Sequence, residues 1–430
     1  MSPTRSSTRA TQQAVDPGAT ALPRLLATAG DPSFDGHFRK WGQMPGGGLL
    51  LIDEVQRAGL RGRGGAAFPT YRKLATVSTG RRPVVVANGT EGEPASIKDK
   101  TLLVSAPHLV LDGVGIAADT VGAVEAVICV DRSDAASIKA LSRALSERSA
   151  AQADRVGIRL EAAPSRYVTG EESALVHWLN GGEAKPTFVP PRPFERGVSG
   201  RPTLVNNVET LANLALVARY GSRWFRSLGT AEDPGTALVT VLGDVASPGV
   251  YEFPFGTQIN EIFRAAGAGS SAHSVLAGGY AGTWLPAASA AKLSLDRASF
   301  ASTGAVIGCG SMLVLGEGTC GLATAARIVH WMAGQSAGQC GPCVNGLPAI
   351  ANALDGLAAG DHRRRWHQQL LRWLDMAEGR GACHHPDGTV RMVRSALATF
   401  AKEIDNHRRY GPCKPGQRAV PLPRMDGPWK

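Results

Sequence analysis

The chain has 430 residues, of which 43% are hydrophobic and 19% charged, and its formal net charge is +10. This length exceeds what one hydrophobic core usually supports, so about two to four domains are expected. The positive charge is dispersed, and no basic stripe is interleaved with aromatic residues, which argues against a nucleic-acid-binding protein.

Residues 1–45 are rich in Ser, Thr, Pro and Gly and show little periodicity, which predicts a disordered or loosely attached segment. The first part, Met1 to Thr20, is polar and lacks the apolar core of a secretory signal. No run of about 18 uncharged apolar residues follows anywhere, so no membrane span is expected. These features predict a cytoplasmic protein without direct membrane insertion.

Residues 49–60 predict a short amphipathic helix that runs into a glycine-rich loop, Gly62 to Thr70. Five of the nine residues of this loop are glycine or alanine, and one is arginine. A segment with so few β-carbons lets a ligand approach the backbone, whose N–H groups can donate to phosphate oxygens. The sequence alone leaves open a flexible surface loop instead.

Strands and helices then alternate along the chain, which predicts an α/β domain with a parallel sheet. The predicted strands are residues 83–87, 126–130 and 157–162, and the predicted helices are residues 107–120, 135–147 and 171–179. A proline-rich extended loop is expected over residues 181–202, followed by a helix over residues 210–219.

Two acidic loops follow strands of this predicted sheet. Asn88 to Pro94 comes after the first strand, and Tyr167 to Ser173 comes after the third. Ligands bind at the carboxyl ends of strands in open α/β sheets, so both loops are candidate site segments. The alternatives are a plain acidic turn for the first loop and helix-dipole compensation for the second.

The composition changes near residue 237 to short strands and turns. Residues 239–242 and 248–251 predict a hairpin, and residues 257–266 a helix, within a small α+β unit. Helical patterns dominate the remainder, over residues 325–333, 347–356, 363–378 and 390–407.

The seven cysteines do not have the spacing of a small secreted scaffold. Cys340 and Cys343 form a Cys-x-x-Cys pair at a helix start, and Cys383 is a credible third ligand of a metal or iron–sulfur site. The alternative is a site with neither metal nor cluster. His384 and His385 follow directly, as surface residues or as a source of a fourth ligand. We expect Cys129, Cys309 and Cys320 to be core residues, and leave Cys413 unassigned.

Taken together, these motifs resemble the NADH-binding flavoprotein subunit of respiratory complex I. That family includes the flavin subunits of NAD-linked hydrogenases and formate dehydrogenases. The resemblance covers roughly residues 46–410 and rests on four motifs in order, followed by the cysteine region. The motifs are Gly59 to Thr70, Asn88 to Pro94 with Lys98 and Asp99, Tyr167 to Ser173, and Gly200 to Thr210.

The resemblance implies an α/β architecture of three parts. These are a Rossmann-like FMN- and NADH-binding domain, a small ubiquitin-like β-grasp (SLBB) domain and a C-terminal helical iron–sulfur bundle. The expected bounds are residues 46–235, 236–303 and 324–412, with a connector at 304–323 and a tail at 413–430.

The resemblance also implies the site residues, in which Glu93 and Glu172 are the catalytic candidates and Phe68 and Glu93 lie at the NADH pocket. Cys340, Cys343 and Cys383 are the implied cluster ligands. The implied flavin-binding residues are Gly62, Arg63, Gly64, Gly65, Lys73, Asn88, Glu91, Tyr167, Gly170, Glu171, Glu172, Asn206, Asn207 and Thr210.

Two sets of positions depart from the family pattern. Thr90, Thr76 and the stretch Val189 to Arg192 differ on the side that binds the nicotinamide nucleotide in relatives, where Arg192 or Phe194 is a candidate replacement. Ala337 stands where the family has the first of four cluster cysteines. Three thiolates suit a [3Fe-4S] cluster, or a [4Fe-4S] cluster with a different fourth ligand.

The sequence therefore predicts an oxidoreductase in which NADH reduces FMN and single electrons pass through an iron–sulfur cluster. The expected acceptor is a ferredoxin-like or other iron–sulfur redox protein, and further subunits of a complex are possible partners. Two alternatives stand beside this prediction: a flavoprotein with another donor, such as reduced ferredoxin, and a non-enzymatic scaffold with decayed cofactor sites.

Overall fold

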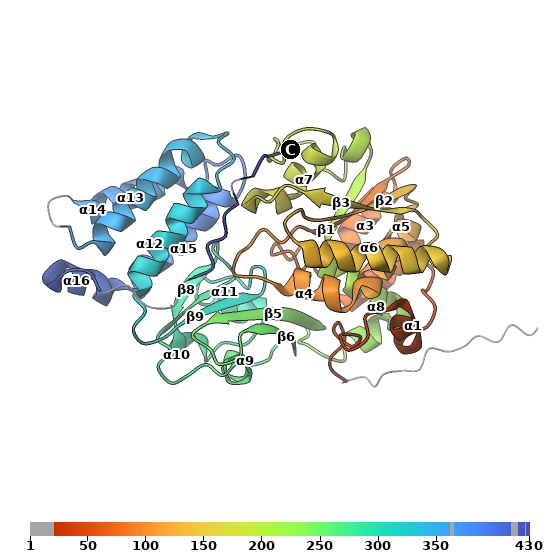
Figure 1. The fold of residues 1–430 in the computed structure, drawn as a ribbon, viewed down its shortest axis with the longest axis horizontal. Coiled ribbons are helices and arrows are strands. Elements are labelled where there is room, and N and C mark those ends of the chain that lie inside the picture. The colour runs from red at the N-terminus through yellow and green to blue at the C-terminus, as the bar shows by residue number, and fades with distance from the viewer. Residues whose placement is uncertain (1–20, 362–364, 414–419, 426) are drawn as a thin grey trace, which may run out of the picture.

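The computed structural model describes residues 21–361, 365–413, 420–425 and 427–430. An α/β domain lies on the right of Figure 1, a smaller mixed sheet with short helices lies below, and a bundle of helices lies on the left. The predicted fold class, an α/β protein with a helical C-terminal region, is confirmed.

The α/β domain is built on a four-stranded sheet in the order β3-β2-β1-β4, with all strands parallel. Helices α5 and α8 pack on one face of this sheet and α7 packs on the other. The strands are β1 (Val84–Gly89), β2 (Glu125–Asp131), β3 (Ile158–Ala163) and β4 (Thr203–Asn207). The helices are α2 (Leu49–Ala58), α3 (Thr70–Ser78), α4 (Lys98–Ser105), α5 (Pro107–Val121), α6 (Ala135–Ala150), α7 (Glu172–Leu179) and α8 (Val208–Phe225), with short 3-10 turns η1 (Tyr167–Gly170) and η2 (Val198–Gly200).

The sequence missed β4, which follows the proline-rich loop directly. This strand is only five residues long and ends in two asparagines, so it carries too few apolar residues to be read as a strand. It nevertheless pairs with β1 along its whole length and forms one edge of the sheet.

The prediction of a loosely attached N-terminal segment is wrong for residues 21–45, while residues 1–20 lie outside the described part of the chain. Residues Phe34–Trp41 form helix α1, whose first turn is capped by Ser33. Leu25 and Trp41 are buried in the core of the α/β domain, and His37 contacts Asp112 of α5 at 2.9 Å. This segment is therefore part of the domain.

The second sheet has five strands in the order β6-β5-β9-β7-β8. The predicted hairpin is confirmed as the antiparallel pair β5 (Thr236–Gly243) and β6 (Gly249–Pro254). The expected connector at 304–323 contains β9 (Ser311–Leu315), which lies in the middle of this sheet and pairs with both β5 and β7. The sheet therefore extends beyond residue 303. The other elements are β7 (Ser274–Ala277), β8 (Thr283–Pro286), α9 (Ile259–Ala266), α10 (Ala287–Ala290) and α11 (Arg297–Ala301).

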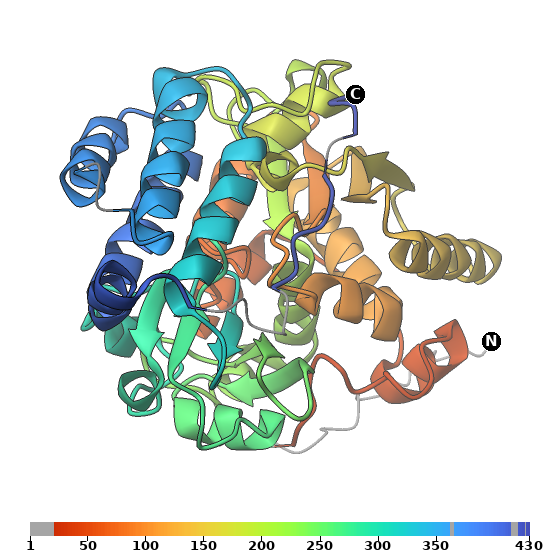
Figure 2. The same ribbon diagram turned by 60° about the vertical axis from the view of Figure 1, so that its left-hand side comes forward.

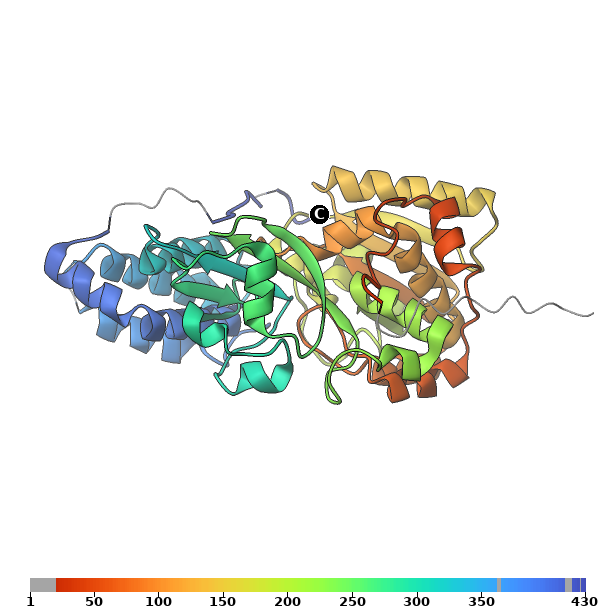
Figure 3. The same ribbon diagram turned by 90° about the horizontal axis from the view of Figure 1, so that it is seen from below.

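Both faces of the sheet are buried along β7 and β9 and most of β5, where apolar residues occupy successive positions, whereas β6 is only partly buried. Val275 and Val314 face α9, whereas Leu276, Leu313 and Leu315 face the helical bundle. The sheet thus lies between α9 and the bundle, and viewed from below it occupies the middle of the molecule (Figure 3).

The bundle contains one more helix than predicted. Residues 390–407 were expected to form one helix, but the chain breaks at Phe400, whose φ of −103° and ψ of 22° leave the helical region. The Phe400 ring packs edge-on against Trp284 of β8 at a centroid distance of 5.1 Å. The elements are α12 (Gly321–Gly334), the π-helical turn η3 (Pro342–Gly346), α13 (Leu347–Ala358), α14 (Trp366–Ala377), α15 (His385–Thr399) and α16 (Ala401–Tyr410).

The described C-terminal residues return from the bundle to the α/β domain, as the dark blue trace of Figure 2 shows. Trp331 of α12 donates its indole N–H to Pro423 O at 2.8 Å, and Ala184 N donates to Trp429 O at 2.8 Å. The Trp429 ring receives the cations of Arg166 and Lys185 at 4.7 and 5.0 Å. We call the described residues 420–425 and 427–430 the C-terminal strap.

Among the described residues, no single helix is long and apolar enough to cross a membrane. Helices α4 and α5 meet the length and composition criteria only as a pair bent by 95°. Nearly every residue of α5 is buried in the α/β core.

Candidate functional site

The glycine-rich loop is closed at its base by backbone hydrogen bonds. Thr70 N donates to Leu60 O at 3.0 Å, and Gly62 N donates to Phe68 O at 2.9 Å. Gly65 has a φ of +110°, which a residue with a side chain rarely adopts. These bonds fix the loop in one conformation, which argues against the alternative of a flexible surface loop.

The loop lies directly on the carboxyl end of β4. A β-carbon at Gly64 would approach Asn207 Cβ to 3.3 Å, and Arg63 N donates to Thr210 Oγ1 at 2.8 Å. A β-carbon at Gly62 would meet only ordinary contacts at 3.6 Å. The structure thus brings together two segments that the resemblance assigned to one site.

Three asparagines mark this edge of the sheet. Asn88 and Asn207 are register partners on β1 and β4, and their amides donate to Gly170 O at 2.8 Å and Asp99 Oδ2 at 2.6 Å. Asn206 is 6% exposed, and its amide nitrogen has no hydrogen-bond partner among the described residues. Because buried donors are nearly always paired, this amide is available to a ligand.

Lys73 and Glu172 form an ion pair beside the loop. Lys73 Nζ lies 2.8 Å from Glu172 Oε2 and donates to Val205 O at 3.1 Å. It also lies 5.9 Å from the centre of the Phe68 ring, which is partly exposed. The pair therefore places a charged carboxylate and an aromatic face at one opening of the site.

Backbone N–H groups at two helix N-termini donate to two of the predicted carboxylates. Glu91 accepts from Asp99 N at 3.0 Å and Lys100 N at 2.9 Å, at the start of α4. Desolvation, with a further effect of Asp99, raises the pKa of Glu91 to about 7. Glu171 caps α7 by accepting from Ser173 N and Ala174 N at 3.0 and 2.9 Å. Both side chains hold the loops in place.

The Glu93 carboxylate connects three chain segments from two domains. Its carboxylate accepts from Ala95 N at 3.0 Å, from Tyr280 N of the mixed sheet domain at 2.9 Å and from the Tyr167 hydroxyl at 3.3 Å. Desolvation raises the pKa of Glu93 to about 7, against the opposing effect of these hydrogen bonds. A carboxyl group with such a pKa can hold or release a proton near neutral pH.

A buried charge cluster that the sequence left out of the site lies beneath the loop. Lys98 Nζ lies 2.6 Å from Asp99 Oδ1 and 2.8 Å from Glu209 Oε2, and all three side chains are almost inaccessible. Burial by itself lowers the pKa of Lys98, but the two carboxylates raise it well above its usual value. Glu209 Oε1 also accepts from Leu238 N of β5 at 3.0 Å, so the cluster links two domains.

A cavity of about 480 Å³ lies between the glycine-rich loop and the mixed sheet domain. Arg63 lies at this boundary, with its guanidinium 4.4 Å from the centre of the Phe255 ring. Burial lowers the pKa of Arg63, and the nearby Glu209 opposes that effect. The cavity is lined by residues 61–63 and 65–69 of the loop region, by Lys98 and Glu209, and by residues 305–310, among others. Its size is typical of small-molecule sites.

The three predicted cluster cysteines lie in the loops between bundle helices. Cys343 sits on the π-helical turn η3 and is 3% exposed, while Cys340 and Cys383 are partly exposed. Burial, together with the nearby Cys340 and Cys383, raises the pKa of Cys343 to about 12, against the opposing effect of a hydrogen bond with Ser336. The predicted thiols are therefore neighbours.

Ala337 is buried next to these thiols in sequence and offers no ligand atom. Of the two histidines after Cys383, His384 is fully exposed, whereas His385 is buried and its Nε2 lies 2.9 Å from Met332 O. His385 Nδ1 has no hydrogen-bond partner among the described residues, and burial lowers the pKa of this ring to about 4. His385 is thus the histidine that keeps a buried free lone pair.

On the side of the nicotinamide nucleotide, the candidate replacements differ in position. Phe194 packs against the core of the α/β domain, so it does not supply a free aromatic face. Arg192 is exposed, and so is Phe188, which is 87% exposed in the same loop. Thr76 is exposed on α3.

The residues present fit both implied cofactors. The loop without side chains and the unpaired Asn206 amide suit a phosphorylated, hydrogen-bonding flavin, and three neighbouring thiols suit an iron–sulfur cluster.

Comparisons with known proteins point to the same two groups. Residues 55–216 match the sequence model described as the Nuo51 FMN-binding domain. Residues 323–407 match that of the NADH-ubiquinone oxidoreductase-F iron-sulfur binding region.

Whole-chain relatives agree with this. A NADH-quinone oxidoreductase subunit of Rhizobium meliloti is 30% identical over 83% of this chain and 88% of its own length. The NADP-reducing hydrogenase subunit HndC of Solidesulfovibrio fructosivorans is 29% identical over 83% of this chain and 76% of its own length.

A chain of a NAD+-reducing [NiFe]-hydrogenase in the H2-reduced state has a similar structure, with a TM-score of 0.77 and 32% identity. The similarity covers 84% of this chain but only 63% of the hydrogenase chain, so this protein spans less than two thirds of that chain's length.

Proposed function

The chain belongs to the family of NADH-quinone oxidoreductase flavin subunits, and from this membership we propose that it moves electrons from NADH through FMN and an iron–sulfur cluster to a partner redox protein. When bound, FMN accepts a hydride and releases electrons singly, and the cluster carries single electrons onward. The chain is an oxidoreductase, and its own residues bind, orient and insulate these groups.

The observation that carries the proposal is the meeting of the glycine-rich loop with Asn207 at the carboxyl edge of the parallel sheet. A β-carbon at Gly64 would lie 3.3 Å from Asn207 Cβ, and the buried Asn206 amide next to it lacks a partner among the described residues. This edge is where open α/β sheets bind nucleotides. We assign the flavin to this cradle, with Lys73 close to it.

Glu93 and Glu172 have different roles in this proposal. Glu93, with its pKa raised to about 7, holds a proton near the site and ties Tyr167 to the mixed sheet domain. Glu172 stays paired with Lys73 at the opening, where it can orient a ligand. Phe68 provides the exposed ring against which a nicotinamide nucleotide can stack, worth about 1 kcal/mol.

Electrons leave through the bundle in this proposal. The Tyr167 ring, at the flavin edge, meets Trp331 of α12 edge-on at 5.6 Å, so the bundle contacts the flavin loop directly. Cys340, Cys343 and Cys383 are the proposed ligands, with His385 Nδ1 a candidate for the fourth position. The relatives are subunits of larger enzymes, which supports further subunits. We propose a ferredoxin-like or other iron–sulfur protein as the acceptor.

The proposed donor is NADH, since the relatives' names include NADH or NADP. The exchanged residues Thr76, Val189 and Arg192 predict weaker binding than in relatives, because a lost aromatic stack or charged hydrogen bond costs about 1–3 kcal/mol. Restoring Val189→Lys and Arg192→Phe together should then tighten NADH binding by about tenfold.

The proposal is tested by anaerobic stopped-flow reduction of the purified protein. We expect NADH to bleach the flavin absorbance rapidly, and reduced ferredoxin to do so slowly. Gly64→Val should remove flavin without unfolding the chain, whereas Gly157→Val, at a site with open surroundings, should keep it. Faster bleaching by ferredoxin would favour the other donor, and a colourless protein without iron would favour the scaffold alternative.

A further inference from the structure

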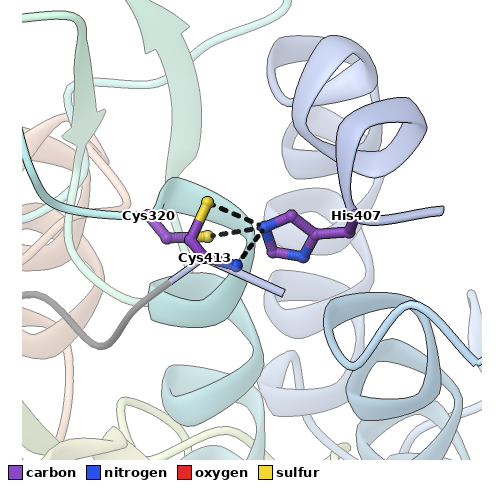
Figure 4. A group of neighbouring side chains, drawn as sticks. All are labelled: Cys320, His407 and Cys413. Atoms are coloured by element: carbon purple, nitrogen blue, oxygen red, sulfur yellow. Dashed lines mark hydrogen bonds between the residues drawn. The ribbon is translucent and has the colours of Figure 1, made fainter. Parts of the chain in front are cut away.

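A group of metal-ligating side chains outside the flavin and iron–sulfur sites closes the far end of the bundle. Figure 4 shows Cys320, His407 and Cys413 with both thiols directed at one nitrogen of the imidazole. His407 Nε2 lies 3.5 Å from Cys320 Sγ and 3.0 Å from Cys413 Sγ. The three ligand atoms all lie within 4.8 Å of one another.

Glu403 lies beside this group and contacts one of its members. Its Oε2 accepts from Cys320 Sγ at 3.2 Å and from Leu322 N at 3.0 Å. The group itself combines two thiols and one imidazole, which come from the start of α12, from α16 and from the segment after α16.

The tautomer of His407 suits a metal ligand. The ring is 1% exposed, and its Nδ1 lies 2.7 Å from Ala358 O, which can only accept. Nδ1 therefore carries the proton, and the Nε2 lone pair faces the two thiols. A hydrogen bond from the outer ring nitrogen to a carbonyl is the usual support of a metal-bound histidine.

Cys320 lies at the start of a helix. It is the N-cap residue of α12, and its Sγ accepts from Ala323 N at 3.3 Å. The positive end of a helix favours a negatively charged sulfur once a metal has replaced the thiol proton. Without a metal, the Cys320 thiol donates to Glu403 Oε2 at 3.2 Å.

The distances agree with tetrahedral zinc. With a Zn–S bond of about 2.3 Å and a Zn–N bond of about 2.0–2.1 Å, tetrahedral angles separate sulfur from nitrogen by about 3.5 Å. The Cys320 Sγ to His407 Nε2 distance already has this value, and Cys413 Sγ needs to retreat by about 0.5 Å. Cys413 is exposed and lies in a coil, so this adjustment is open to it.

We propose that Cys320, His407 and Cys413 bind a Zn²⁺ ion, with the Glu403 carboxylate beside Cys320. Two thiolates and an imidazole favour zinc over magnesium or calcium. The ion would clamp the first bundle helix to the last and fix the chain at Cys413, upstream of the C-terminal strap. This proposal does not depend on the electron-transfer function.

The first test is the metal content of the full chain, purified without a histidine tag and measured for zinc and iron together. We expect about one zinc per chain. Cys413→Ser should lose the zinc while flavin and iron contents stay unchanged, since it lies outside both cofactor sites. Cys309→Ser is the matched control, because Cys309 does not belong to the group, and it should keep the zinc.

A second measurement separates this site from zinc misplaced at the iron–sulfur thiols. Cys340→Ser should leave the zinc content unchanged. The wild-type chain, stripped of zinc with a chelator and given Co²⁺, should show the visible absorption of tetrahedral, thiolate-bound cobalt. This measurement does not depend on whether a variant folds. A wild-type chain without zinc and without this cobalt spectrum would overturn the proposal, as would zinc that disappears with Cys340→Ser but persists with Cys413→Ser.

Discussion

Replacing Lys98 by methionine should test whether the buried charge cluster holds the flavin domain to the mixed sheet domain. Lys98 Nζ is the cation between Asp99 and Glu209, at 2.6 and 2.8 Å, and all three side chains are almost inaccessible. Methionine has a similar length, so little cavity forms. The change leaves Asp99 without its cation and Glu209 with only Arg63, whose Nε lies 3.9 Å away, and breaking a buried pair in this way costs about 3–5 kcal/mol.

The effect should be measured as thermal and urea unfolding of the cofactor-loaded protein, followed by circular dichroism. A loss of 3–5 kcal/mol lowers the melting temperature of a domain of this size by about 6–20 °C. Glu209→Gln in the same chain should recover part of the loss, because it removes one of the two carboxylates that Lys98 balances. The amide oxygen of Gln can still accept from Leu238 N, as Glu209 Oε1 does.

The control is the exposed cation Arg394, which lies 2.7 Å from Asp375 and 3.0 Å from Glu378. Arg394→Met should cost about 1 kcal/mol or less, since exposed pairs are screened by solvent. Equal effects of Lys98→Met and Arg394→Met would refute the reasoning, and so would a double variant less stable than Lys98→Met alone.

Three further predictions concern the site. Gly64→Ala should displace Asn207, which lowers the protein's stability and weakens flavin binding by about tenfold or more. Gly62→Ala would meet only ordinary contacts at 3.6 Å and should change the stability by less. Equal stability of the two variants in urea unfolding would contradict this. Cys383→Ser should remove the cluster iron, and Ala337→Cys should raise the iron count from about three to about four and abolish a [3Fe-4S] signal in electron paramagnetic resonance; iron unaffected by Cys383→Ser would exclude this ligand set. The pKa of Glu93 rises from 4.5 to about 7 on folding, so the folded chain binds more protons and the Glu93 contribution to stability falls as pH rises through this window. Between pH 4.5 and 7.5, the unfolding free energy of Glu93→Gln relative to that of the wild type should therefore rise by up to about 3 kcal/mol. A difference that stays constant with pH would argue against a raised pKa.

The elements that the sequence predicted correctly are those with a clear local pattern of residues. The apolar runs of β1 and β2 and the glycine-rich loop all lie where they were expected. Strand β4 was missed because Asn206 and Asn207 end it, and its place in the sheet depends on pairing with β1, more than a hundred residues earlier. Its asparagines were found only through the family motif.

Residues that act through distant partners were the hardest to assign. Glu209 follows Asn207 closely in sequence, yet its acceptor role is defined by Leu238 in another domain. Cys320 was expected to be a core residue, and it is buried, but its sulfur faces His407, 87 positions away. No short motif encodes such a spacing, so only the folded chain reveals the group.

The arrangement of Glu93 explains why the mixed sheet domain belongs to the site. The α/β domain supplies Glu93 and Tyr167, but the second donor to the Glu93 carboxylate is Tyr280 N of the mixed sheet domain. The rings of Tyr167 and Tyr280 both meet Trp331 of the bundle edge-on at 5.6 Å. Trp331 in turn donates to Pro423 O of the C-terminal strap, whose Trp429 receives Arg166, the residue before Tyr167.

These contacts form a closed circuit that runs from Glu93 and Tyr167 through all three domains and back. A displacement of the bundle would therefore disturb the desolvated surroundings of Glu93 that raise its pKa. The protonation of Glu93 is thus coupled to how the bundle is seated against the α/β domain.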